Sequence, residues 1–122
     1  MQRTNRPVFL NLARLQYPVG AVASIGHRIS GVVLALALPF AVLALERSLN
    51  DEARFHAMMD FVRLPAVLLA WAAAQHLFAG IRHLLSDVDV GSSLQASRIS
   101  AFAVLIAAAA VALAALLAGL AG

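Results

Sequence analysis

Histidine, arginine and serine carry the chemistry that this chain can perform. The sequence has four histidines and nine basic residues, all of them arginine, but no cysteine. Disulfides, thiolate zinc sites, iron–sulfur ligation and cysteine nucleophiles are therefore excluded for this chain. Ser24, His27 and Arg28 follow one another at i, i+3 and i+4, a spacing that places them on one face of a helix. A buried arginine on such a face needs an anionic partner or a route to water.

A second polar face follows later in the chain. His76, Gly80 and His83 stand at i, i+4 and i+7, again on one face of a helix. A buried imidazole needs a metal ion or a hydrogen-bond partner, so His76 is either a metal ligand or a histidine that bonds between helices. Gly80 removes a side chain one turn away, which suits a flat macrocycle and equally suits simple helix packing. Haem iron accepts a neutral imidazole, and the site has no cysteine, methionine or carboxylate set for another metal.

The elements that position these two faces are expected to cross a membrane. The chain has 122 residues, of which 62% are hydrophobic and 12% charged, against roughly a quarter charged in soluble domains. Three stretches carry no charge: 29–45, 64–81 and 99–122. Each reaches the ~20 residues of a spanning helix once its weakly polar flanks are included. We therefore expect an all-α membrane protein with three transmembrane helices.

The chain is interpreted as a single membrane-anchor domain, 1–122. The three spans are expected at about 21–45, 64–84 and 99–121. Polar residues interrupt the first 20 residues, so the unbroken apolar core of a signal peptide is missing. We expect 1–20 to form an interfacial segment instead.

Two prolines and an alanine-rich stretch give local expectations. Pro65 should stand in the first turn of the second span, whereas Pro39 should bend the first span. The third span contains 11 alanines, a small-residue surface that lets backbones approach closely. It is expected to pack without contributing chemistry.

Arginine counts predict the orientation. The side where the first span begins and the second ends carries six arginines, and the other side carries three. This asymmetry favours an N-terminus in the cytoplasm or in the mitochondrial matrix. His27 and His76 then lie about 9 and 12 Å inside the same membrane edge, at ~1.5 Å per residue. Because the arginines are scattered singly between apolar runs, nucleic-acid binding is not expected.

Two motifs carry a resemblance to a known family. The first comprises Arg6-Pro7-Val8 and the run SIGHRISG at 24–31, and the second is HLFAGIRHL at 76–84, followed by Asp87. In order and spacing they resemble the two signatures of the cytochrome b556 family, the larger membrane anchor of succinate dehydrogenase. Two positions depart from the family pattern: Ser86 replaces an aromatic residue or methionine, and Asp89 replaces a small residue.

The resemblance implies a four-subunit enzyme. In that family a flavoprotein subunit with FAD oxidises succinate, an iron–sulfur subunit relays electrons through its clusters, and two anchor subunits share one haem b and reduce ubiquinone. By motif position His76 would be a haem axial ligand, with the second histidine on the smaller anchor. Ser24 and Arg28 would line the quinone pocket, and His27 with Arg28 would neighbour the haem propionates. His83 is a further candidate on the face of His76.

Simpler interpretations and rival functions stand beside this one. Arg28 alone is also typical of an interfacial anchor, and Arg82, His83 and Asp87 are each typical of a solvated helix end. His56 falls in the loop after the first span and receives no role. The rivals are a structural anchor without haem and a small transporter subunit, although inverted repeats are missing. The Arg6-Pro7 motif leaves no room for a transit peptide, so we expect a bacterial inner, or cytoplasmic, membrane with its lipid as a partner.

Overall fold

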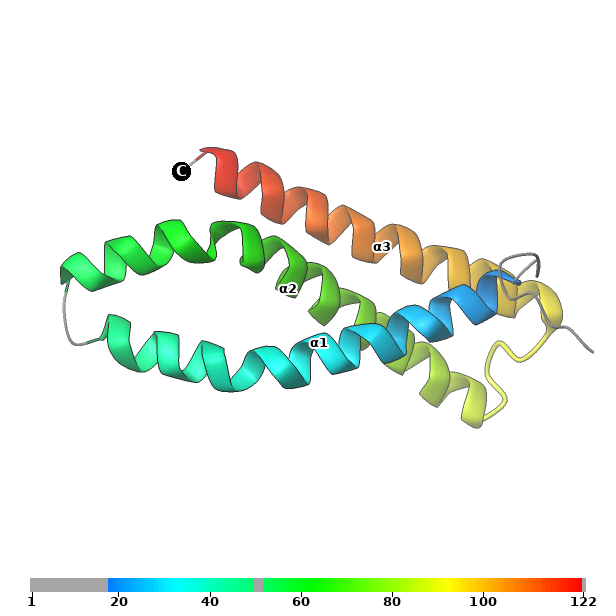
Figure 1. Ribbon diagram of the computed structural model, residues 1–122. Helices are drawn as coiled ribbons and strands as arrows, with labels where there is room; N and C mark the ends of the chain where they lie inside the picture. Colours follow the sequence, from blue (N-terminus) through cyan, green and yellow to red (C-terminus); the bar gives the residue numbers. More distant parts are fainter. Residues whose placement is uncertain (1–17, 50–51, 122) are drawn as a thin grey trace, which may run out of the picture.

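The computed structural model describes residues 18–49 and 52–121, apart from the side chains of Asp60 and Leu64. Within these ranges the chain forms three α-helices and no strand: α1 covers Val19–Ser48, α2 covers Glu52–Asp87 and α3 covers Leu94–Ala121 (Figure 1). The all-helical prediction is confirmed. The expected interfacial segment, with Arg3, Arg6 and Arg14, lies almost wholly outside the described residues.

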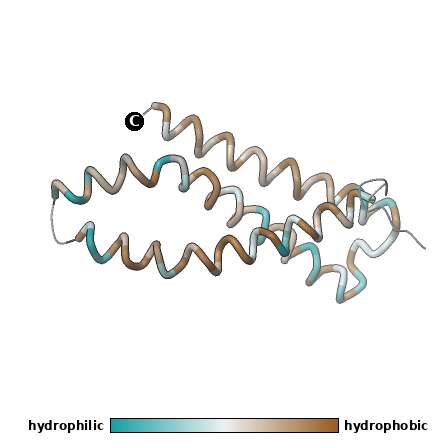
Figure 2. Tube along the Cα trace, in the orientation of Figure 1, coloured by the Kyte–Doolittle hydropathy of each residue, from teal (hydrophilic) through white to brown (hydrophobic). Residues whose placement is uncertain are grey.

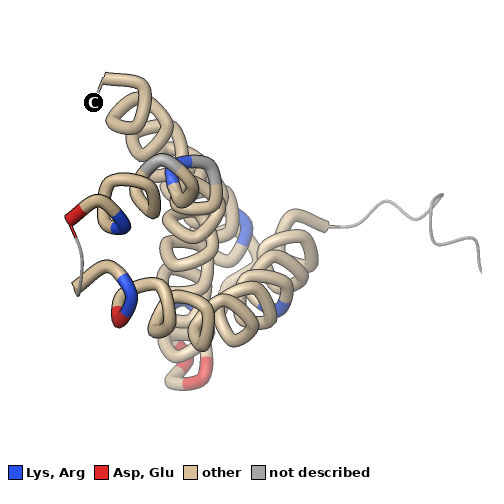
Figure 3. The backbone as a smooth tube through the Cα atoms, turned by 60° about the vertical axis from the view of Figure 1, so that its left-hand side comes forward, with Lys and Arg blue, Asp and Glu red and all other residues tan. Residues whose placement is uncertain are grey.

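The helices are long enough to cross a membrane. They contain 30, 36 and 28 residues, and at ~1.5 Å per residue even the shortest is about 42 Å long. α1 and α3 are apolar enough to span, and α2 is a third span if its two arms, Glu52–Arg63 and Pro65–Asp87, count as one. Figure 2 shows the hydrophobic residues running along the helices, and Figure 3 shows long stretches without charge.

Proline bends the second helix strongly. α1 continues through Pro39 as one helix, whereas the arms of α2 meet at Pro65 with a bend of 62°. The expectation that Pro65 stands in a first turn is therefore wrong, because α2 already begins at Glu52. Inside a helix, the proline ring removes a backbone hydrogen bond and clashes with the carbonyl four residues earlier, here that of Phe61.

Small residues form the contacts between helices. α2 lies between α1 and α3 and packs on both (Figure 1). The buried apolar residues are almost all alanine: Ala23, Ala72, Ala74, Ala79, Ala101, Val104 and Ala108. Such residues allow close backbone approach without filling space between helices. The large apolar side chains remain on the outside, where a membrane protein meets lipid.

A Schellman motif ends α2. Val90 N–H donates to the carbonyl of Leu85 at 2.9 Å, and Asp89 N–H donates to that of Ser86 at 3.1 Å. This pair of bonds requires a left-handed residue after the helix, usually glycine. Here Asp89 occupies it with φ 60°, followed by Gly91 with φ 73°. The aspartate that departs from the family pattern therefore lies at the position where the chain turns towards α3.

Candidate functional site

Three histidines from two helices meet near one end of the bundle. The rings of His27 on α1 and His76 on α2 stack, with centroids 4.2 Å apart and planes at 18°. His83 lies on the other side of His27, with centroids 5.2 Å apart and planes at 48°. We call the part of the bundle around these rings the histidine end. The structure thus brings together the two faces that helical spacing predicts.

The ring of His76 is held from α1. Its Nδ1 lies 3.1 Å from the carbonyl oxygen of His27 and 3.5 Å from Oγ of Ser30. Ser30 is fully buried and donates its hydroxyl proton to the same carbonyl at 2.8 Å. Because a carbonyl oxygen only accepts, the His76 bond requires the proton on Nδ1. In the neutral ring the other nitrogen, Nε2, then keeps its lone pair.

Glycine makes room for this arrangement at a position that the sequence did not single out. A Cβ on Gly31 would lie 3.0 Å from Cε1 of His76 and 3.2 Å from its Nδ1, too close for the ring to stay in place. A Cβ on Gly80, the glycine that the spacing indicated, would lie 3.5 Å from Nε2 of His27, an ordinary contact. Gly80 therefore faces the ring of His27, and the tight fit to His76 belongs to Gly31.

Gln75 fastens α2 to α1 one residue before His76, and sequence reasoning missed it. Its side chain is 1% exposed, and Nε2 donates to the carbonyl of Ala23 at 3.3 Å. A Cβ on Gly26 would lie 2.8 Å from that nitrogen and 3.3 Å from Cδ, so a larger residue there would force the Gln75 side chain to move. The Oε1 atom is buried and accepts no hydrogen bond within the described chain. The signal in the sequence that could have identified Gln75 is a glutamine inside an apolar stretch, next to a histidine.

The two residues expected at the quinone pocket lie on the surface of α1. Ser24 is half-buried and Arg28 is exposed. Both belong to the turns that carry His27, at the histidine end. Arg28 is therefore open to a ligand or a chain from outside this one, which suits its permanent charge.

Two of the residues interpreted as a solvated helix end instead contact neighbouring helices. Arg82 is half-buried and binds α3: Nη2 donates to Oγ of Ser97 at 2.8 Å and to its carbonyl at 3.4 Å, and Nε donates to Oγ of Ser100 at 3.1 Å. His83 is half-buried beside His27. The interpretation is wrong for Arg82 because α3 returns against the end of α2, and for His83 because its ring lies beside His27 of α1. Asp87 is exposed as expected.

The described residues contain no cluster of ligands for a bare metal ion. Within residues 18–49 and 52–121, no three histidine, cysteine, aspartate or glutamate side chains are placed to bind one. The rings of His27 and His76 stack face to face. A haem needs only one axial imidazole from each side, and a fixed His76 with a free Nε2 fits that requirement. His56 is exposed near the start of α2, with its ring 5.8 Å from that of Phe55.

Comparisons with known proteins place the chain in a family. Residues 2–116 match the family model described as "Succinate dehydrogenase/Fumarate reductase transmembrane subunit". The chain is 37% identical over 107 residues to the succinate dehydrogenase cytochrome b556 subunit of Coxiella burnetii, covering 83% of this chain and 86% of that protein. It is 30% identical to the subunit of the same name from Rickettsia felis, covering 83% and 82%.

The similarity extends to a relative with another name. The succinate dehydrogenase cytochrome b560 subunit of Reclinomonas americana is 32% identical over 103 residues, covering 75% of this chain and 70% of that protein. Both sequence motifs and all three helices lie within or overlap the matched residues 2–116. The chain belongs to the family of succinate dehydrogenase and fumarate reductase transmembrane subunits.

Proposed function

We propose that this chain is an anchor subunit of succinate:ubiquinone oxidoreductase that binds one haem b together with a second anchor subunit. The observation that carries the proposal is the 3.1 Å contact between Nδ1 of His76 and the carbonyl of His27. An axial histidine commonly donates its other N–H to a carbonyl, which fixes the tautomer and the plane of the ring. His76 is the axial ligand from this chain, and the second axial histidine comes from the smaller anchor.

The residues around His76 fit a haem with acidic side groups. His27 covers one face of the His76 ring at 4.2 Å, which limits how the ring turns. Arg28, the next residue on α1, is exposed, and a guanidinium binds a carboxylate through paired hydrogen bonds. We assign His27 and Arg28 to the vicinity of the propionates. When bound, the haem supplies one-electron exchange.

Ser24 and Arg28 are assigned to the reduction of ubiquinone. A quinone that gains electrons develops negative charge on its carbonyl oxygens and takes up two protons to become a quinol. The hydroxyl of Ser24 and the guanidinium of Arg28, one turn apart on α1, are donors that stabilise this charge. We assign His83, half-buried beside His27 near the end of α2, as a third residue of the cofactor site.

The other cofactors and partners belong to the rest of the enzyme. FAD lies on a flavoprotein subunit. The iron–sulfur clusters lie on a further subunit, since this chain has no cysteine to bind them. We assign the chain to a bacterial inner membrane, and the six-to-three arginine asymmetry supports an orientation with the histidine end towards the cytoplasm. A reporter that is active only outside the cytoplasm, fused to Gly122, should give signal, and activity of a fusion at Val90 instead would contradict this orientation.

The absorption spectrum of the purified complex tests the haem assignment. His76→Ala should remove or convert the spectrum of a low-spin b-type haem, because the iron loses an axial imidazole. His56→Ala is the matched control, since that histidine is exposed near the start of α2. An unchanged spectrum in the His76 variant, with loss in a His83→Ala variant, would move the axial ligand to His83. An unchanged spectrum in both would leave a haem ligand from this chain without support.

A further inference from the structure

A cavity lies between α1 and α2 at the end of these helices away from the histidines. It has a volume of about 520 Å³, within the ~300–1,000 Å³ range of binding pockets for small molecules. Eight residues line it: Phe40, Leu43, Ala44 and Arg47 from α1, and Arg54, Ala57, Met58 and Phe61 from α2. The haem and quinone proposal uses none of them.

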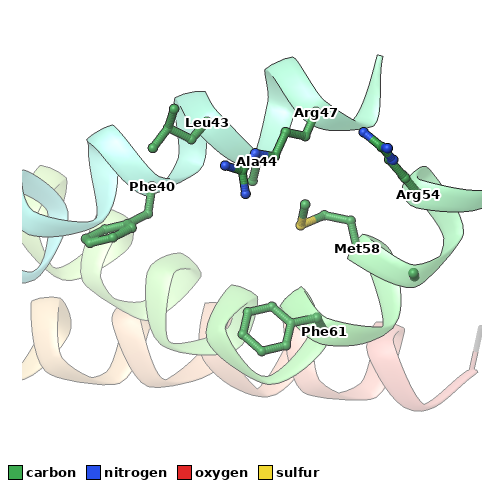
Figure 4. A pocket seen from close by; sticks show the side chains of 8 residues that line it. Phe40, Leu43, Ala44, Arg47, Arg54, Met58 and Phe61 are labelled. Atoms are coloured by element: carbon green, nitrogen blue, oxygen red, sulfur yellow. The ribbon is translucent and has the colours of Figure 1, made fainter. Parts of the chain in front are cut away.

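The lining combines two positive charges with apolar walls. Arg47 lies in the last turn of α1 and Arg54 in the first turn of α2, and the other six lining residues are apolar. Figure 4 shows Arg47 reaching from α1 into the space between the helices, with Met58 and Phe61 on the opposite wall. The lining therefore favours an anion joined to an apolar body.

The charges and the apolar walls follow one another along the membrane normal. Arg47 is at the helix end, where lipid headgroups lie, and Phe40 is seven residues nearer the middle of α1, about 10 Å at ~1.5 Å per residue. Phe40 and Phe61 are 72% and 76% exposed, so the walls open sideways to lipid. A ligand with its charge at the interface and its apolar part in the hydrocarbon matches both levels.

We propose that this cavity binds a phospholipid with an anionic headgroup. The phosphate lies between the guanidinium groups of Arg47 and Arg54, and the first part of the acyl chains lies along Phe40, Met58 and Phe61. Guanidinium groups bind phosphate through charge-assisted and often bidentate hydrogen bonds. A zwitterionic lipid carries a compensating positive charge, so its attraction to this pair is weaker.

Lipid binding to the whole purified complex tests the proposal. The complex is stripped of endogenous lipid in detergent and titrated with phosphatidylglycerol or phosphatidylcholine, and bound lipid is counted by native mass spectrometry. The double variant Arg47→Gln/Arg54→Gln should lose about tenfold or more in affinity for phosphatidylglycerol, because charge-assisted bonds disappear. The control Arg98→Gln removes one positive charge from an exposed residue of α3, and the complex that carries it should bind as the unmodified complex does.

A second pair of variants tests the apolar part without changing charge. Ala44→Leu fills the cavity and should weaken binding, whereas Ala41→Leu, exposed on α1 and outside the lining, should not. Equal binding of the two lipids, an unaffected double variant, or equal occupancy by inorganic phosphate alone would overturn the proposal. Loss of the second anchor subunit from the purified double variant would also overturn it, because the arginines would then hold a protein.

Discussion

The histidine end and the cavity end of the bundle use the same two helices in opposite ways. Near the histidines, α1 and α2 approach so closely that a Cβ on Gly26 or Gly31 would lie 2.8 or 3.0 Å from a side chain of α2. Towards the connection between the helices they line an open cavity of about 520 Å³. At the first end polar side chains bond between helices, and at the second end two arginines and apolar side chains line the cavity (Figure 4). A site that fixes a ring needs tight packing, and a site that accepts a flexible lipid does not.

The largest expected difference between the ends is in quinone reduction. Ser24→Ala should lower electron transfer from succinate to ubiquinone by about 10²–10³-fold, the usual loss when a donor to developing charge is removed. Succinate oxidation by an artificial acceptor should continue, because that reaction is completed on other subunits. Both rates are measured on the same membranes.

Ser48→Ala is the control at the cavity end. Ser48 is half-buried and bonds only to the carbonyl of Leu45 in its own helix, at 2.8 Å, so both rates should stay normal. Full quinone reductase activity in the Ser24 variant would show that this hydroxyl only packs, and would move the quinone site elsewhere.

The next effect concerns added volume. Gly31→Ala places a methyl group 3.0 Å from Cε1 of His76, so the ring must shift away from the His27 carbonyl. Overpacking of this kind costs about 1–3 kcal/mol. We expect a lower melting temperature of the complex and an altered haem spectrum.

Gly119→Ala makes the same change where nothing lies within 4 Å, and there the spectrum should stay unchanged and stability should not fall. If both alanine variants have the spectrum and melting temperature of the unmodified complex, the histidine end is not as tightly packed as the contacts indicate.

Arg82 provides an intermediate effect at the histidine end. Arg82→Leu removes three hydrogen bonds to Ser97 and Ser100 and leaves the serine hydroxyls without this partner. Hydrogen bonds to charged groups contribute about 1.5–3 kcal/mol when buried, and partial exposure reduces this to about 1 kcal/mol. Thermal unfolding of the purified complex measures the loss, with exposed Arg98→Gln as the control. Equal melting temperatures of the two variants would argue against a tie between α2 and α3.

The smallest effect has the opposite sign. Asp89→Gly should stabilise the chain by up to about 1 kcal/mol, because glycine adopts the left-handed conformation of Asp89 without the cost of a Cβ. The melting temperature should rise slightly while the haem spectrum stays constant. Asp87→Gly, two residues earlier at the last helical position, should destabilise instead. A fall in stability of the Asp89 variant would mean that the carboxylate stabilises this turn.

The sequence by itself determined the helices and which residues share a face. Charge-free stretches of spanning length predict the helices, and the 3.6-residue period predicts which residues share a face. Both inferences need only the local geometry of a helix. Ser24, His27 and Arg28, and likewise His76, Gly80 and His83, were therefore placed without any tertiary information. The family motifs lie on these same faces, which is why the candidate site could be named before the fold was known.

Only the tertiary structure decided how close the helices come and where α2 bends. Gly31 rather than Gly80 accommodates His76, Gln75 bonds to α1, and Ser30 of α1 contacts His76 of α2. These contacts depend on the rotation and separation of two helices. Arg82 is bonded because α3 returns beside it. α2 bends at Pro65 because the helix begins at Glu52, beyond its apolar stretch, and the proline therefore lies inside it. Spacing within one helix carries no information on such distances, since interhelical packing is set by the side chains of both partners at the contact.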